Sequence, residues 1–316
     1  MADVKKMATR EGYGRGLVAL GAAHEDVVVL DADLAGSTKT GMFAKAYPDR
    51  HFNCGIAEAD MMCVAAGFAA NGFVPFASSF AMFAAGRAFE QIRNSIGYPH
   101  LNVKIGATHG GLSVGEDGAT HQCIEDFSLM RTIPGMTVLC PCDAHEMTLA
   151  VEALLQYEGP AYMRLGRSAV ETVTDSIPGY HFQLGKGVTL RDGKDVTIVA
   201  VGMMVQMALK AADILSAEGI SARVLDFHTI KPLDQELLLA AAKETGAIVT
   251  AENHNVTCGL GSVVANCLAK NCPTIQEFVG VQDQFGQVGP QDFLMDEYGL
   301  RAANIVSAVK KAISRK

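Results

Sequence analysis

Residues 106–122, GATHGGLSVGEDGATHQ, combine five glycines with two histidines and an acidic pair. Glycine allows backbone conformations that other residues rarely adopt, and it lets the chain pass close to a ligand. His109, Asp117 and His121 add side chains that can bind a substrate or move a proton. Because loops of this composition commonly carry chemistry, we expect this segment to line a functional site.

Glu58 is a second candidate, because it stands at the start of a helical pattern that is otherwise almost entirely apolar. Two interpretations stand. A carboxylate in the first turn is favoured by the helix dipole and can be purely structural. Alternatively, a partly desolvated carboxyl group is suited to sharing a proton with a ligand nitrogen.

The remaining candidates also have structural interpretations. A loop histidine such as His121 can be satisfied by backbone groups, and Asp117 can stabilise its own turn. Arg167 follows a strand and could bind an anion or form a surface ion pair. Phe80 and Phe83 are three residues apart on one helix face, and that spacing alone predicts core packing.

Short strands alternate with helices along the first half of the chain. The expected strands are 27–33, 74–79, 101–108, 136–141 and 161–166, and the expected helices are 57–72, 80–97 and 143–159. Asn71-Gly72 ends the first helix, and Asp143 caps the third. This alternation predicts an α/β fold with an open, mostly parallel sheet covered on both faces.

The alternation of strand and helix patterns stops after residue 172 and resumes further along the chain. We therefore expect a first domain at 1–172, a linker at 173–190 and a second, smaller α/β domain with a mixed sheet at 191–316. Its expected strands are 195–202, 221–227 and 247–253, and its expected helices are 203–219, 233–246, 262–270 and 301–316.

Three polar segments follow strands of the first domain, namely 31–38 (DADLAGST), 53–60 (NCGIAEAD) and 106–122. Ligands of open parallel sheets bind beyond the carboxyl ends of the strands. The three segments should therefore converge on one rim of the sheet.

Composition restricts the partners. The 316 residues carry a formal net charge of −8 without a lysine- or arginine-rich run, which disfavours nucleic acid and anionic membranes. The longest apolar stretch, 198–209, is too short to span a bilayer. The start of the chain lacks the pattern of a secretory signal, and eight dispersed cysteines suit a reduced cytoplasmic protein.

Cys140 and Cys142 have no further metal ligand in view, so we expect them to be small side chains at a strand end.

Taken together, these segments resemble the carboxyl-terminal half of transketolase. The motif GEDGxTHQ at 115–122, with GIAEAD upstream at 55–60, is the most specific part. Further matching pieces cover nearly the whole chain in the family's order: DADLAGST, GFVPFASSFAMF, TIPGMTVLCPCD, GPAYMRLGRS, TIVAVG and VLDFHTIKPLD. The resemblance implies that the first domain is a thiamine diphosphate pyrimidine-binding domain and the second a transketolase carboxyl-terminal domain.

The resemblance also implies residue roles. Glu58 looks like the glutamate that hydrogen-bonds N1′ of the aminopyrimidine and so helps the thiazolium C2 to lose its proton. His121 looks like a histidine beside the reacting hydroxyls of the donor. The other implied contacts are sugar hydroxyls for His109 and Asp117, a substrate phosphate for Arg10, Ser37 and Arg167, the pyrimidine-pocket wall for Phe80 and Phe83, and a further cofactor contact for Asp33.

Two departures from the family pattern matter. Gly86 stands where many transketolases have a third aromatic residue. The chain also lacks a GDG motif with a downstream asparagine, the family's Mg²⁺ and diphosphate pattern, since 115–118 and 191–193 do not provide that context. We therefore assign no metal ligand to this chain. We expect a separate amino-terminal transketolase subunit to hold Mg²⁺ and the diphosphate, most simply in an α2β2 assembly that acts on sugar phosphates.

Three alternatives remain open. Deoxyxylulose-phosphate synthase shares a DGxTH loop, but it is usually one longer chain with an acidic residue in place of His109. The β subunit of a 2-oxoacid dehydrogenase has a similar length but lacks the GEDGxTHQ loop. A non-catalytic binding or regulatory protein of the same fold would have no need to retain Glu58, His109 and His121 together.

Overall fold

The first domain is built around a seven-stranded sheet in the computed structural model, which describes residues 5–316. The strand order is β12-β6-β7-β5-β4-β2-β3. The parallel strands are β2 (Val27–Asp31), β3 (His51–Asn53), β4 (Val74–Phe80), β5 (Lys104–Thr108), β6 (Thr137–Leu139) and β7 (Ala161–Leu165). At one edge, β12 (Thr229–Lys231) comes from the second half of the chain and pairs antiparallel with β6. The predicted mostly parallel α/β fold is confirmed; residues 1–4 of the expected first domain lie outside the described residues.

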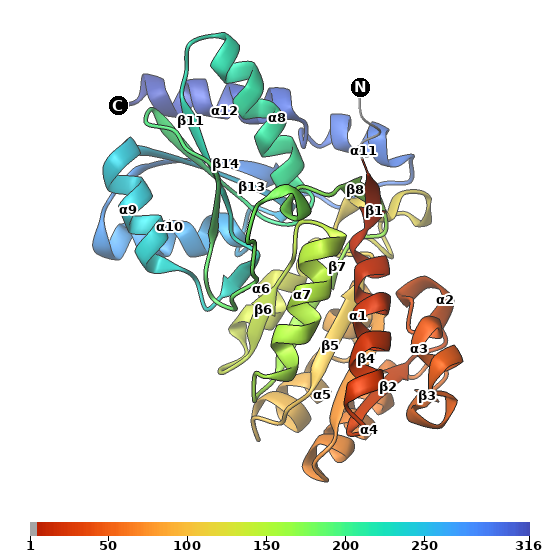
Figure 1. The fold of residues 1–316 in the computed structure, drawn as a ribbon. Coiled ribbons are helices and arrows are strands. Elements are labelled where there is room, and N and C mark those ends of the chain that lie inside the picture. Colours follow the sequence, from red (N-terminus) through yellow and green to blue (C-terminus); the bar gives the residue numbers. More distant parts are fainter. Residues whose placement is uncertain (1–4) are drawn as a thin grey trace.

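Helices cover both faces of this sheet (Figure 1). Val27 and Val29 of β2 face the layer that contains α1 (Thr9–Ala23) and α7 (Ala144–Leu155). Val28 and Leu30 face the opposite layer, which contains α4 (Glu58–Ala70) and α6 (Asp126–Thr132). Successive strand residues point to opposite faces, so an uninterrupted apolar strand can serve both layers.

The predicted helix at 80–97 is present in an altered form and does not include Phe80, which is the last residue of β4. The prediction that Phe80 and Phe83 share one helix face is therefore wrong. The helix divides into η2 (Met82–Arg87), α5 (Phe89–Gln91) and η3 (Ile92–Gly97), and η2 and η3 are π-helical. The amide of Ala88 accordingly donates to the carbonyl of Phe83, five residues earlier, at 3.3 Å. Such wide turns are frequent near functional sites. The shorter helices of this domain are α2 (Ala35–Thr38), α3 (Gly41–Ala46), η1 (Pro48–Arg50) and η4 (Leu112–Asp117).

The second domain contains a five-stranded sheet in the order β14-β13-β10-β11-β9. Its strands are β9 (Val188–Arg191), β10 (Val196–Ala200), β11 (Ala222–Asp226), β13 (Ala247–Asn255) and β14 (Ile275–Val281). All neighbouring pairs are parallel except β9 with β11, so this sheet is mixed, as predicted. Its helices are α8 (Met204–Ala217), α9 (Gln235–Thr245), α10 (Leu260–Asn271), α11 (Gln291–Glu297) and α12 (Ala302–Ser314). Figure 1 shows α8 and α12 on one side of the sheet and α9 and α10 on the other.

The segment between the two sheets contains some regular structure. A short strand, β8 (Ala169–Glu171), pairs antiparallel with β1 (Lys6–Ala8), and one turn of helix, η5 (Thr174–Ser176), follows. Among the helices of residues 5–316, none combines the length and apolar character needed to cross a bilayer.

Candidate active site

Segments after β2, β3 and β5 approach one another at the carboxyl edge of the first sheet. The amide of Asp33 donates to Oδ1 of Asn53 at 3.1 Å, which joins the segments after β2 and β3. His109 has a φ of 62° and Gly111 a φ of 79°, so the chain turns sharply as it leaves β5. Left-handed backbone at a non-glycine residue such as His109 is uncommon and often marks a functional position.

Aromatic rings gather at this edge. The imidazole of His109 stacks on Phe80, with ring centroids 4.0 Å apart. Phe83 lies nearly parallel to Phe80 at 5.9 Å, and His121 contacts Phe83 edge-on at 5.2 Å. Phe80 is buried and Phe83 is half-buried. The structure therefore brings both phenylalanines and both histidines together, which helical spacing alone did not reveal.

His109 is neutral at physiological pH. Burial, and next the positive charges of Arg10 and Arg167, lower its pKa to about 3. Its Nδ1 lies 2.9 Å from the hydroxyl of Thr108. A neutral imidazole has one donor and one acceptor nitrogen, so His109 is suited to contact a hydroxyl group.

Glu58 begins α4 with its side chain almost completely buried, at 1% exposure. Its Oε2 pairs at 2.7 Å with Nη1 of Arg87, a side chain that is half exposed. The guanidinium of Arg87 also lies over the ring of Phe83, 4.6 Å from its centroid. The sequence did not point to Arg87, because no local pattern links it to a carboxylate 29 positions earlier.

Two arginines form a cationic region beside His109. Nη1 of Arg10 donates to the backbone carbonyl of Ser37 at 2.9 Å, while its Nε is buried without a partner among the described residues. Arg167 contacts the carbonyl of Val114 and the carboxylate of Glu116, the latter at 3.1 Å. Burial lowers the pKa of Arg10, and the nearby charge of Arg167 acts in the same direction. Two like charges in proximity, one with an unused buried N–H, suit an anionic ligand.

The two aspartates of the predicted site are both exposed. Asp33 has a φ of 62°, and its side chain accepts a hydrogen bond from Asn53 at 3.1 Å. Asp117 lies at the end of η4. The buried neighbour Asp31, which no sequence pattern singled out, accepts hydrogen bonds from the hydroxyls of Thr38 at 2.6 Å and Thr40 at 2.9 Å. Asp31 therefore fixes the loop that carries Ser37.

Gly86 lies beneath the side chain of Met82. A β-carbon added at Gly86 would collide with the Met82 methyl group, the flexible end of that side chain. The Met82 thioether thus lies over the position at which the family pattern has a third aromatic residue. Methionine adapts readily to irregular apolar surfaces.

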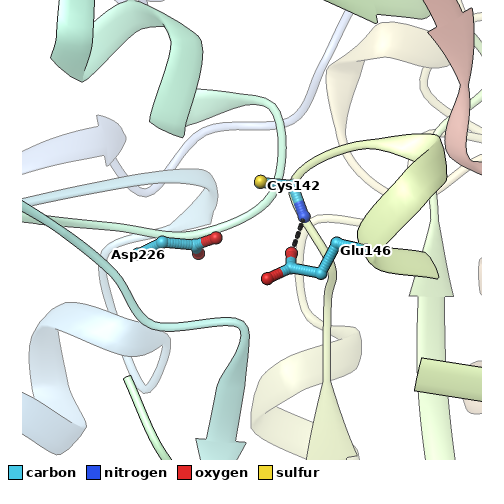
Figure 2. A group of neighbouring side chains, drawn as sticks. All are labelled: Cys142, Glu146 and Asp226. Atoms are coloured by element: carbon cyan, nitrogen blue, oxygen red, sulfur yellow. Dashed lines mark hydrogen bonds between the residues drawn. The ribbon is translucent and has the colours of Figure 1, made fainter. Parts of the chain in front are cut away.

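A separate cluster lies at the junction of the two domains (Figure 2). Cys142, Glu146 and Asp226 are buried, and their ligand atoms lie within 4.8 Å of one another. The expectation that no further ligand would lie near Cys142 is therefore wrong. The amide of Cys142 donates to Glu146 at 2.6 Å, and the hydroxyl of Tyr180 also donates to this carboxylate.

The carboxyl group of Asp226 has a raised pKa in this cluster. Both oxygens of its fully buried carboxyl group lack a partner among residues 5–316, and Figure 2 shows the group directed toward Glu146. Burial, and next the neighbouring Glu146, raise the pKa of Asp226 well above its usual range. A proton shared between the two carboxyl groups explains their proximity without a metal ion.

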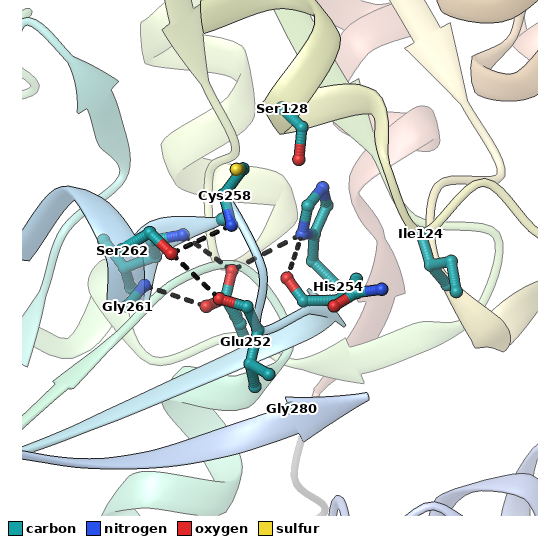
Figure 3. A network of polar contacts seen from close by, with 12 residues as sticks. Ile124, Ser128, Glu252, His254, Cys258, Gly261, Ser262 and Gly280 are labelled. Atoms are coloured by element: carbon teal, nitrogen blue, oxygen red, sulfur yellow. Dashed lines mark hydrogen bonds and ion pairs between the residues drawn. The ribbon is translucent and has the colours of Figure 1, made fainter. Parts of the chain in front are cut away.

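A third polar network surrounds Glu252 at the start of α10 (Figure 3). The carboxylate accepts hydrogen bonds from the amides of Leu260 at 2.7 Å and Gly261 at 2.8 Å. Burial raises its pKa to about 7, although these amides oppose the shift. Nδ1 of His254 lies 3.7 Å away. Because the chain's own carboxylate fills this helix N-terminus, we assign the network a structural role and not anion binding.

Comparison with protein families identifies both domains. A family model described as "Transketolase, pyrimidine binding domain" matches residues 5–172, and one described as "Transketolase, C-terminal domain" matches residues 185–305.

Several relatives match over nearly their full lengths. The 6-deoxy-6-sulfo-D-fructose transketolase subunit of Clostridium sp. (strain MSTE9) is 45% identical over 290 residues, which are 92% of this chain and 89% of that protein. An apulose-4-phosphate transketolase subunit of Phocaeicola vulgatus is 37% identical over 309 residues, which are 98% of each chain.

Solved transketolase structures have the same fold as this chain. One described as "Split gene transketolase, inactive beta4 tetramer" is 54% identical, has a TM-score of 0.91, and aligns over 98% of this chain and 99% of its own. Transketolase from Leishmania mexicana shares the fold, with a TM-score of 0.83 at 24% identity, and the alignment covers 100% of this chain but 47% of that one.

Proposed function

Since this chain belongs to the transketolase family, we propose that it is the C-terminal subunit of a split transketolase. The complete enzyme would transfer a two-carbon ketol unit from a ketose phosphate to an aldose phosphate through thiamine diphosphate. The observation that carries the proposal is the grouping of buried Glu58, the Phe80–Phe83 stack and the two histidines at one sheet edge.

The residues at this edge fit the aminopyrimidine part of the cofactor. Phe83 offers a half-buried aromatic surface, and Glu58 offers a desolvated carboxylate to a ring nitrogen. When bound, thiamine diphosphate supplies the electron sink that cleavage of a carbon–carbon bond requires. Glu58 would hold or release a proton at the pyrimidine N1′ atom.

The two histidines would act on the sugar. His109 remains neutral, so it would orient a sugar hydroxyl by hydrogen bonding, together with Asp117. His121 lies at the open edge of the aromatic stack, and it would transfer a proton to or from the reacting hydroxyls.

The cationic region formed by Arg10 and Arg167 suggests that the substrate is an anionic sugar. Arg10 and Arg167, with Ser37, would bind its phosphate, because guanidinium groups bind phosphate in a bidentate manner. The relatives named above act on a sulfonated sugar and on a sugar phosphate, so their substrates are also anionic. We favour a phosphorylated ketose.

A partner subunit would complete the site. The chain lacks the GDG and asparagine pattern, so an amino-terminal subunit would hold Mg²⁺ and the diphosphate. The split-gene relative described as an inactive β4 tetramer supports a requirement for a second subunit. We expect an α2β2 enzyme, and we place it in the cytoplasm because all eight cysteines are free thiols.

Reconstitution tests this proposal. The chain is mixed with an amino-terminal partner that carries the GDG and asparagine pattern, thiamine diphosphate and Mg²⁺. Ketol transfer is then assayed from xylulose 5-phosphate to ribose 5-phosphate and, in parallel, from a sulfonated ketose. We expect transfer by the mixture and none by either subunit. A well-formed complex that transfers from neither ketose would contradict the proposal.

A further inference from the structure

Arg87 contacts both Glu58 and Phe83 through the same planar group. Its Nη1 lies 2.7 Å from Oε2 of Glu58, and its central carbon lies 4.6 Å from the centroid of the Phe83 ring. The carboxylate is almost completely buried, whereas the arginine is 50% exposed. The guanidinium therefore covers these two groups from the solvent side.

These two contacts are the ones that the proposed function gives to the aminopyrimidine. A guanidinium and an aminopyrimidine are both flat, both hydrogen-bond to a carboxyl group through nitrogen, and both stack on an aromatic face. The opposite face of Phe83 is unavailable, because Phe80 lies nearly parallel to it with centroids 5.9 Å apart. A ring that hydrogen-bonds to Glu58 and stacks on Phe83 would therefore need the space that the guanidinium occupies.

We propose that Arg87 holds the place of the aminopyrimidine in the cofactor-free chain, and that the cofactor must displace it. The proposal rests on the role proposed for Glu58. It makes Arg87 a positioning residue that keeps the buried carboxylate paired and the aromatic stack covered until the cofactor arrives.

The local structure permits this exchange. Arg87 is the last residue of the π-helical segment η2, and it lies four residues after Phe83, a spacing that places both side chains on one helix face. Its side chain is long and half exposed, so it can rotate into solvent without disturbing the core. The cost of that rotation is loss of a partly screened ion pair and a cation–π contact.

Cofactor affinity tests the proposal. The dissociation constant of thiamine diphosphate is measured by titration calorimetry on the complex with the amino-terminal partner and Mg²⁺. We expect Arg87→Ala to bind the cofactor about three- to tenfold more tightly than the wild type, because nothing has to be displaced. The dissociation constant of Arg87→Lys should fall between those of the wild type and Arg87→Ala, since lysine keeps the charge but loses the flat surface.

Arg191→Ala is the matched control. Arg191 forms a surface ion pair with Asp213 at 2.5 Å in the second domain, and its removal should leave the dissociation constant unchanged. Unchanged or weaker binding by Arg87→Ala would overturn the proposal for Arg87 alone. A wild-type complex that binds no cofactor would overturn the proposed function and this inference together.

Crystal structures of the complex with and without cofactor provide a second readout that does not depend on activity. We expect the Arg87 guanidinium to leave Glu58 and Phe83 in the loaded complex. A loaded complex in which it keeps both contacts would contradict displacement.

Discussion

Nε of Arg164 in β7 lies 3.1 Å from the carboxylate of Asp126 in α6, and both side chains are buried. The same guanidinium donates to the carbonyl of Asn253, in the second domain, at 2.8 Å and to that of Cys123 at 2.7 Å. It also passes so close to Gly110 that a β-carbon there would collide with it. Arg164 therefore connects the two domains directly behind the glycine-rich loop.

Removing this arginine should destabilise the chain strongly. Arg164→Met would leave the charge of Asp126 buried and unpaired, so we expect the free energy of unfolding to fall by about 3–5 kcal/mol. Urea denaturation followed by circular dichroism measures the change. The double variant Asp126→Asn/Arg164→Met should recover part of the loss, because it leaves no unpaired charge. A loss below about 1 kcal/mol in the single variant would show that the pair is not needed.

Glu58→Gln should abolish most activity without affecting assembly. Glutamine keeps the shape and can still accept a hydrogen bond from Arg87, but it cannot exchange a proton with a ring nitrogen. We expect kcat to fall by at least about 100-fold. Sedimentation velocity should give the same complex as the wild type. A fully active Glu58→Gln enzyme would show that the assigned role is wrong.

The arginines beside His109 should discriminate between charged and neutral donors. Arg10→Ala and Arg167→Ala each remove hydrogen bonds to an anion, so KM for a ketose phosphate should rise by about tenfold or more. KM for a neutral ketose should change little. Because Arg167 is already paired with Glu116, we expect the larger effect at Arg10. Equal effects on charged and neutral donors would contradict phosphate binding by these residues.

The shared proton at the domain junction predicts a specific pH dependence. The raised pKa of Asp226 means that the folded chain holds a proton that the unfolded chain releases above a pKa of about 3.9. The linked stability is therefore present at low pH and is lost as the pH rises toward the native pKa. Glu146, Asp143, Cys142, Cys140 and Tyr180 are titratable groups that interact with it, and each of them is neutral or anionic.

Asp226→Asn should remove this dependence, because an amide can donate to Glu146 without a titrating proton. We expect the variant to be more stable than the wild type at pH 8, by an amount that shrinks toward pH 5. Urea midpoints at several pH values measure the difference. Asp213→Asn, at an exposed position, is the control. A difference that does not vary with pH would rule out the shared proton.

Local sequence signals predicted elements with clear ends. Asp143 and Asp234 accept hydrogen bonds from the amides of Glu146 and Leu237, so both act as helix caps. Helix α1 was not predicted, because the glycines in TREGYGRGLVALGAA have low helix propensity. Tertiary packing explains these glycines, because a β-carbon at Gly12 or Gly16 would crowd α7 at Ala144 and Val151.

The site was predictable only in part. The convergence of the loops on one rim follows from parallel strands, and the family resemblance supplied the roles of individual residues. The pairing of Glu58 with Arg87 and of Glu146 with Asp226 joins residues far apart in the chain. A local pattern singled out Glu58, but none singled out Arg87, Glu146 or Asp226. Only the folded structure reveals these pairings.

Cofactor binding by the separate subunits is the most direct test of the proposal that this chain holds only part of the cofactor site. Thiamine diphosphate and Mg²⁺ are titrated calorimetrically into this chain alone, into the amino-terminal partner alone and into an equimolar mixture. We expect the mixture to bind tightly, and this chain alone to bind at least about 100-fold more weakly, because it lacks the groups that hold Mg²⁺ and the diphosphate. Equal affinity in this chain alone and in the mixture would contradict a site completed by a second subunit.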